Sequence, residues 1–431
     1  MQKIADYVNQ VFVFELIFLM LVRYFMFLLS FQLLLSSCSV FDPNYNKEKL
    51  PGKRQKVFIS NNKEGTLGRK VALTKRCTSL QSLDKIKLLA QKKIDMFQTL
   101  GVTNKPLITK DKVIILTSKG RLLAYNLDLN KKLWNKSLSS SLTTVGKIVE
   151  EDDILYVTYG INKLIAVDSQ SGKEIWTAKF DDVVKGRSII YGDKIFLHSA
   201  HNEIYALKKS DGTIIWRHID TDHVQSTVAD FAPVVYDKNV IFQVANNEII
   251  ALDIEKGTVS KIFVINNQYG FNRGETHKHI PNHFFIENNI IYATSKDGKF
   301  LAIDYKTQEE LWQQEINSSA KFLVYGKLIY VITDKDELAV LNKKTGQIEY
   351  LVDLNSCIKL KNNYHKWTKP VIYNKNSILI TSYDGYLLKF DIHSGKLLAS
   401  IGDMEFVTSS PAVAGDYIYV VSNNGHIYKY R

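Results

Sequence analysis

The stretch that decides the fold reads Ile154-Leu-Tyr-Val-Thr, then Leu164-Ile-Ala-Val-Asp, then Gly172-Lys-Glu-Ile-Trp. Short apolar runs rich in β-branched and aromatic residues, separated by polar turns, predict three consecutive antiparallel strands. The glycine supplies the positive φ of a tight turn, and an aspartate before it can accept hydrogen bonds from the turn backbone. Residues 154–176 therefore predict most of one small antiparallel sheet.

Seven further copies of this unit follow one another along the chain. Four of the eight copies place an alanine ten residues before a tryptophan, with aspartate or glycine in the turn: Ala124–Trp134, Ala166–Trp176 with Asp168 and Gly172, Ala206–Trp216 with Gly212, and Ala302–Trp312 with Asp304. Three copies keep the spacing with other residues: Ala251–Lys261, Val340–Tyr350 and Lys389–Ala399. The eighth, centred on Lys429, reaches the C-terminus before its last strand. The mean step is (429 − 124)/7, about 44 residues, the length of a four-stranded propeller blade.

The repeat predicts an all-β fold, an eight-bladed β-propeller of four-stranded antiparallel blades over residues 93–431. A single blade has two apolar faces, and radial stacking buries both while leaving only short edges. We expect each wide tryptophan ring to cover the seam between neighbouring blades, beside the small alanine. Because the eighth copy lacks its last strand, we expect an N-terminal strand to close the ring, with Lys93–Thr99 as the candidate. The alternative is an arm that takes no part in the ring.

The N-terminus has the features of a secretory signal. The apolar run from Val11 to Leu35 contains Arg23 and ends in Leu35-Ser-Ser-Cys38, which resembles the lipobox of bacterial lipoproteins. We therefore predict a signal peptide over residues 1–37, cleavage before Cys38 and lipidation of that cysteine. The residue after it is Ser39 and not aspartate, which in lipoproteins of this kind usually permits export to the outer membrane. An uncleaved transmembrane anchor over Leu16–Leu35 is the alternative.

The net charge of +12 is concentrated in one segment. Residues 38–105 carry 15 Lys or Arg and 5 Asp or Glu, a net of +10, and residues 1–37 are neutral, so residues 106–431 hold only 12 − 10 = +2. A basic N-terminal arm over residues 38–92 favours an anionic surface. In a secreted chain we expect that surface to be lipid headgroups, with no nucleic acid as partner. The composition, 45% hydrophobic and 23% charged, excludes a wholly disordered chain.

The pattern Ala-x-Asp-x-x-x-Gly-x-x-x-Trp at Ala166–Trp176 resembles the repeat shared by pyrroloquinoline-quinone dehydrogenases and the BamB family of outer-membrane lipoproteins. Cys38, the motif Leu50-Pro-Gly-Lys-Arg and the eight copies extend the likeness to BamB over nearly the whole mature chain. It implies a scaffold with no enzymatic activity and no cofactor, lipid-anchored at the periplasmic face of the outer membrane. Its partners would be the POTRA domains of a BamA-like assembly protein and, further, unfolded outer-membrane proteins, whose insertion it would aid.

The alternative function is a quinone-dependent dehydrogenase-like or other ligand-binding periplasmic propeller. The quinone enzymes place a disulfide between adjacent cysteines against the cofactor and hold Ca²⁺ with carboxylates. The three cysteines of this chain, Cys38, Cys77 and Cys357, are far apart, and no Glu/Asn/Asp set marks a metal. A phosphate-binding glycine loop and a nucleophile elbow are also missing from the sequence. No catalytic residue is therefore predicted.

Partner contacts in the BamB family lie on two loops that precede middle blades, and they use an arginine and closely spaced aspartates. The corresponding loops here are residues 220–230, which lack arginine, and residues 273–283, which lack an aspartate pair. The candidate contact residues on them are Thr227, Val228, Asp230, Arg273, His277 and His279. His277, His279 and His283 form an H-x-H-x-x-x-H cluster, in which His277 and His279 could share a metal on one face of a strand. No carboxylate or cysteine accompanies them, and a solvated loop explains the same residues. No metal site is predicted.

Five other residues carry expectations about pairing or exposure. Cys77 and Cys357 could pair in an oxidising compartment or remain free thiols, and the sequence leaves both open. Trp367 falls outside the repeat register and is expected to be exposed. His198, like His201, flanks a predicted hairpin turn and is expected at the surface.

Overall fold

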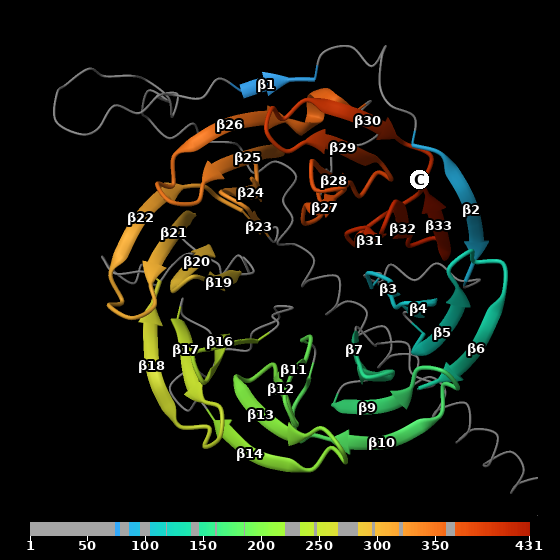
Figure 1. Cartoon of the computed structure of the whole chain (residues 1–431), viewed down its shortest axis with the longest axis vertical. Coiled ribbons are helices and arrows are strands. Elements are labelled where there is room, and N and C mark those ends of the chain that lie inside the picture. The colour runs from blue at the N-terminus through green and yellow to red at the C-terminus, as the bar shows by residue number, and fades with distance from the viewer. Residues whose placement is uncertain are drawn as a thin grey trace, which may run out of the picture. The chain divides into compact units, whose positions relative to one another are not determined.

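The repeat units form the blades of one ring. The computed structural model describes residues 74–77, 86–94, 104–117, 119–138, 146–159, 162–184, 186–219, 233–244, 248–265, 283–294, 298–318, 322–358 and 367–431. These residues form eight sheets, with the first strand of each near the centre of the ring and the fourth at its rim (Figure 1). The predicted eight-bladed β-propeller of antiparallel four-stranded blades is confirmed. Within these ranges, no helix is long and apolar enough to cross a membrane.

The blades follow one another in chain order. Blade 1 contains β3 (Leu107–Ile108), β4 (Lys112–Leu116), β5 (Arg121–Asn126) and β6 (Lys132–Ser137). Blade 2 contains β7 (Lys147–Glu151), β8 (Ile154–Tyr159), β9 (Lys163–Asp168) and β10 (Glu174–Lys179). Blades 3 and 4 are β11 (Ile189–Tyr191), β12 (Lys194–His198), β13 (Glu203–Lys208), β14 (Ile214–Ile219), and β15 (Val234–Tyr236), β16 (Asn239–Val244), β17 (Glu248–Asp253), β18 (Val259–Val264).

The second half of the ring contains both N-terminal strands. Blade 5 contains β19 (Phe284–Glu287), β20 (Ile290–Thr294), β21 (Lys299–Asp304) and β22 (Glu310–Glu315). Blade 6 contains β23 (Leu323–Tyr325), β24 (Leu328–Ile332), β25 (Glu337–Asn342) and β26 (Ile348–Asp353), and β1 (Thr74–Arg76) joins it. Blades 7 and 8 are β27 (Val371–Tyr373), β28 (Ser377–Thr381), β29 (Leu387–Asp391), β30 (Leu397–Ile401), and β31 (Ala412–Ala414), β32 (Tyr417–Val421), β33 (His426–Tyr430) with β2 (Leu88–Lys93).

An N-terminal strand closes the ring, as predicted, but its residues differ from the candidate. β2 pairs antiparallel with the C-terminal strand β33, with Ala90 opposite Lys429 and Lys93 opposite His426. The observed strand is therefore Leu88–Lys93 and not Lys93–Thr99, and the boundary predicted between residues 92 and 93 falls inside it. The candidate was wrong because a rim strand is mostly exposed, as β2 is. The apolar residues Leu88 and Leu89 of β2 are themselves exposed, so apolar content does not locate a strand at the rim.

The core of each blade lies in its second and third strands, and neighbouring blades share one apolar cluster. Every residue of β4 is buried, and Leu122–Tyr125 of β5 are buried as well. The cluster between blades 1 and 2 joins Ile114 and Ala124 to Leu155, Val157 and Ile165. Burying each of the larger side chains, such as Ile114 or Leu155, contributes about 1.5–3 kcal/mol. The ring is therefore stabilised at its seams, where each blade completes the core of the next.

The ten-residue spacing of the repeat corresponds to one cross-strand pair between the third and fourth strands. Ala124 faces Trp134, and the same pairing with the same β-bulge beside it occurs in the other complete copies: Ala166–Trp176, Ala206–Trp216, Ala251–Lys261, Ala302–Trp312, Val340–Tyr350 and Lys389–Ala399. β2 repeats this geometry with Ala90 at the tryptophan position opposite Lys429. All seven spaced pairs of the sequence are therefore confirmed as register pairs.

Each seam tryptophan binds the turn of the following blade. The indole N–H of Trp134 donates to the Ser169 carbonyl at 2.9 Å, and that of Trp176 donates to the Lys209 carbonyl at 3.2 Å. A Cβ built on Gly172 would lie 2.7 Å from the Trp134 ring. Glycine is therefore needed there for two reasons, the positive φ of +71° and the close approach of the ring.

Candidate functional site: the arm latch on blade 6

A segment of the basic arm adds a fifth strand to blade 6. β1 pairs in parallel with β26 at the rim, with Thr74 opposite Leu351 and Arg76 opposite Asp353 (Figure 1). Among the described blades, only this one has a fifth strand. An edge strand presents unpaired N–H and C=O groups that another segment can use. We call β1, Cys77 and their contacts on blade 6 the arm latch.

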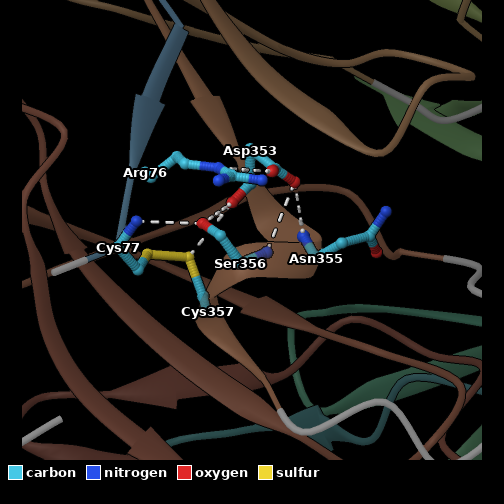
Figure 2. Close-up of a disulfide and its surroundings, with 6 residues drawn as sticks. All are labelled: Arg76, Cys77, Asp353, Asn355, Ser356 and Cys357. Carbon is cyan, nitrogen blue, oxygen red and sulfur yellow. Dashed lines mark hydrogen bonds and ion pairs between the residues drawn. A yellow bond between two sulfur atoms is a disulfide. The ribbon is translucent and has the colours of Figure 1, made fainter. Parts of the chain in front are cut away.

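A disulfide joins the arm to the blade directly after β1. Cys77 is bonded to Cys357, and their Cα atoms are 5.0 Å apart (Figure 2). The backbone N–H of Cys77 donates to the Ser356 hydroxyl at 2.9 Å, and that hydroxyl donates to the Asp353 carbonyl at 2.6 Å. The pairing that the sequence left open is therefore a disulfide supported by a hydrogen-bond chain.

Asp353 organises the short turn that carries Cys357. β26 ends at Asp353 and the 3-10 helix η4 (Leu354–Cys357) begins directly after it. The Asp353 carboxylate accepts from the backbone N–H groups of Asn355 at 3.0 Å and Ser356 at 3.3 Å, which caps the helix (Figure 2). The Arg76 guanidinium lies 3.9 Å from the same carboxylate, but its side chain is 82% exposed. An ion pair this exposed adds little, so the cap and the disulfide define the turn.

Lys75 extends the latch to blade 7. Its ammonium donates to the Ser394 carbonyl at 2.6 Å and lies 4.7 Å from the centre of the Tyr350 ring. Tyr350 is buried, and its hydroxyl donates to the Ile392 carbonyl at 2.7 Å. Burial raises the pKa of Tyr350, and the neighbouring Tyr330 and Asp391 raise it further, so the phenol stays neutral beneath the ammonium. The arm therefore contacts two blades before β2 closes the ring on a third.

The residues predicted to bind partners lie outside the described residues. This holds for Cys38 and for the six loop positions Thr227, Val228, Asp230, Arg273, His277 and His279. His283 is described and buried, and its backbone N–H donates to the Thr294 hydroxyl at 3.1 Å. The ranges that the structure describes contain no group of three His, Cys, Asp or Glu residues that could hold a metal.

Two surface expectations from the sequence were wrong. Trp367 is 7% exposed and belongs to the apolar cluster shared by blades 6 and 7. Its backbone forms an isolated antiparallel β-bridge with Ser382. His198 is 6% exposed because it ends β12, the second strand of blade 3, and its ring lies 5.8 Å from that of Phe242 in the next blade. His201 is at the surface as expected, with its ring nitrogen 2.6 Å from Asp182. Whether these side chains are buried depends on where the folded ring places them, and the sequence of a single hairpin does not reveal this.

Comparison with known proteins points to one family. A family model described as "Outer membrane protein assembly factor BamB" matches residues 143–349, from just before blade 2 into β26. An outer membrane protein assembly factor BamB from Moranella endobia is 23% identical over 75% of this chain and 84% of its own length. An uncharacterised Rickettsia prowazekii protein is 26% identical over 68% of this chain and 73% of its own. The chain is BamB-like.

Solved structures agree with the BamB-like fold. The crystal structure of BamB from Moraxella catarrhalis superposes with a TM-score of 0.66 at 18% identity, covering 80% of this chain and all of that one. A quinohemoprotein alcohol dehydrogenase from Comamonas testosteroni also superposes, with a TM-score of 0.61 at 11% identity, covering 80% of this chain and 76% of that one. At these identities both comparisons show the propeller fold alone, so function must be argued from other features.

Proposed function

We propose that this chain is a non-enzymatic scaffold lipoprotein of the outer-membrane β-barrel assembly machinery. In this proposal Cys38 carries the lipid, and the propeller lies at the periplasmic face of the outer membrane. It binds the POTRA domains of a BamA-like protein and aids insertion of barrel proteins. The observation that carries the proposal is the agreement of the repeat, the ring and the BamB-like relatives over most of the chain.

The strand order supports a single docking face. The first candidate loop follows β14, the rim strand of blade 3, and precedes β15, the inner strand of blade 4. The second follows β18 at the rim of blade 4 and precedes β19 in blade 5. Because every blade runs in the same direction, the rim-to-centre connections all begin and end at the same face of the ring. Both candidate loops are therefore anchored on one face, at adjacent blades.

The arm latch supports an extracytoplasmic location. Disulfides persist in oxidising compartments and are rare where glutathione and thioredoxin keep thiols reduced. The bond between Cys77 and Cys357 therefore favours a secreted chain, in agreement with the signal peptide predicted over residues 1–37.

Site-specific crosslinking tests the proposed partner. A photo-crosslinking residue at Thr227 or His277 in intact envelopes should capture a BamA-like outer-membrane barrel protein. The matched control is Ile175, which is exposed on the rim strand β10 of blade 2 and belongs to neither loop. Capture from Ile175 alone, or of no barrel protein at any position, would contradict the proposal. Loss of membrane attachment in Cys38→Ser tests the anchor separately.

The quinone-dependent dehydrogenase-like alternative predicts a different result. Purified protein incubated with pyrroloquinoline quinone and Ca²⁺ would then bind the quinone and reduce a redox dye with an alcohol or sugar as donor. The similar fold of the quinohemoprotein dehydrogenase is the observation that keeps this alternative worth testing.

A further inference from the structure

The two sulfur atoms of the arm latch differ in their access to solvent. Cys357 is 1% exposed and belongs to the apolar cluster that contains Leu354 and Trp367. Cys77 is only partly buried, at the surface of that cluster, and it follows the exposed residues Lys75 and Arg76. Thiol–disulfide exchange requires a thiolate to reach a sulfur of its partner disulfide, so access decides which cysteine reacts first.

Contacts other than the disulfide hold Cys77 next to Cys357. β1 forms three register pairs with β26, the Cys77 N–H binds Ser356, and the Lys75 ammonium binds the Ser394 carbonyl. None of these contacts involves a sulfur atom. The 5.0 Å between the two Cα atoms lies within the range that a disulfide requires. A reduced arm docked through these contacts therefore presents both thiols ready to be joined.

We propose that the arm latch is a modification site for an oxidant that carries a reactive disulfide, with Cys77 as the entry thiol and Cys357 as the resolving thiol. The Cys77 thiolate attacks one sulfur of the oxidant's disulfide, and the other oxidant sulfur leaves as a thiolate. The Cys357 thiolate then attacks the Cys77 sulfur of this mixed disulfide and displaces the oxidant. The two cysteines lose two electrons and two protons, and the oxidant leaves as a dithiol.

The position of Cys357 places this reaction after folding. Cys357 lies 280 residues from Cys77 in sequence, and its burial needs the packed cluster of blades 6 and 7. The short turn that presents it depends on the Asp353 cap, directly after β26. The oxidant therefore acts on an assembled propeller, and the disulfide it forms links an arm that is already paired with β26 of blade 6.

The order of entry is tested with glutathione disulfide as the oxidant. The mature chain with Cys38→Ser contains only the two latch cysteines. On this background, Cys357→Ser leaves Cys77 and Cys77→Ser leaves Cys357, and β1 can dock in both. We expect glutathione to add to Cys77 at least about tenfold faster than to Cys357 in the folded proteins. The two rates should become similar in denaturant. Equal rates in the folded proteins, or faster reaction at Cys357, would overturn the proposal.

The role of the docked arm has its own readout. Lys75→Ala removes the contacts to Ser394 and Tyr350 and leaves both cysteines in place. We expect the mixed disulfide on Cys77 to persist severalfold longer before Cys357 resolves it, measured by mass spectrometry of acid-quenched samples. Lys92→Ala, in an exposed position on β2, is the matched control and should resolve at the original rate. Unchanged resolution in Lys75→Ala would overturn the idea that the docked arm presents the thiols to each other.

Discussion

Gln308 lies in the turn of blade 5 that faces Lys261 across the seam with blade 4. At the four seams with a tryptophan, the same turn position is a glycine. The glycines are Gly172, Gly212, Gly257 and Gly346, and each has a tryptophan ring of the preceding blade less than 3 Å from a built Cβ. The Lys261 ammonium replaces the indole N–H by donating to the Tyr305 carbonyl at 3.0 Å. A slender lysine leaves space for a side chain on the turn. The residue across the seam therefore determines whether the turn must be glycine.

The first prediction separates the ring contact from the backbone conformation. Gly172→Ala places a methyl group in the Trp134 ring and forces alanine to φ +71°. Gly192 has φ +60° with nothing within 4 Å of a built Cβ, so Gly192→Ala has only the backbone cost. We expect Gly192→Ala to lower the free energy of unfolding by about 1 kcal/mol. Gly172→Ala should lower it by about 1–3 kcal/mol more. Equal losses in chemical denaturation would show that the ring contact is unimportant.

The second prediction concerns the exception at the seam between blades 4 and 5. Lys261→Trp should destabilise the protein by about 1–3 kcal/mol, because the new indole meets the Gln308 side chain. Adding Gln308→Gly should recover most of this loss and rebuild the tryptophan–glycine seam. A double-mutant cycle measures the coupling, which we expect to be about 1–3 kcal/mol and favourable to the pair. Additive effects would mean that the side chains at positions 261 and 308 do not interact.

The repeat made most of the ring predictable from sequence. The alanine-to-tryptophan spacing is a register constraint, so it persists even where Lys261, Tyr350 or Ala399 replaces the tryptophan. Ala399 has a simple reason. Blade 8 has no turn between its third and fourth strands, because its fourth strand is β2 from the N-terminal arm. A tryptophan at position 399 would have no turn to cover.

The arm latch could not be predicted in the same way. β1 is only Thr74-Lys-Arg, and it pairs through backbone atoms, so its side chains carry no apolar pattern. The disulfide joins residues 280 positions apart, and only the ring brings them together. Trp367 was placed wrongly for a related reason, since its burial depends on a cluster shared between two blades. Contacts of this kind depend on closure of the whole ring.

The third prediction is the stability that the disulfide contributes. Cross-linking residues 280 apart restricts the unfolded chain, and the chain-entropy treatment gives about 5.6 kcal/mol for a loop of this length. We expect the Cys77→Ser, Cys357→Ser double variant to lose about 3–5 kcal/mol in the free energy of unfolding, because native disulfides commonly contribute this much. The comparison is made on the Cys38→Ser background by chemical denaturation, with the reduced parent as control. A loss below about 1 kcal/mol would show that the ring constrains the chain without the bond.

The fourth prediction is alkaline instability from buried tyrosines. Burial, helped by the nearby carboxylates of Glu287, Asp391 and Asp128 respectively, raises the pKa of Tyr292, Tyr330 and Tyr419 to about 12. The pKa of each tyrosine is higher in the folded state than in the unfolded state. Its contribution is therefore complete below pH 10, where both states are protonated, and is lost as the pH rises towards 12.

Over this window each tyrosine should lower the free energy of unfolding by about 1.4 kcal/mol per pH unit. Tyr330→Phe removes one ionisable phenol and should reduce the slope by about that amount, although it also removes the hydrogen bond to the Ile392 carbonyl. That carbonyl keeps Tyr350 as a donor, so the stability at neutral pH should change by only about 1 kcal/mol. Denaturation at several pH values, with tyrosinate absorbance followed in parallel, measures both quantities. A slope unchanged by Tyr330→Phe would contradict the raised pKa of Tyr330.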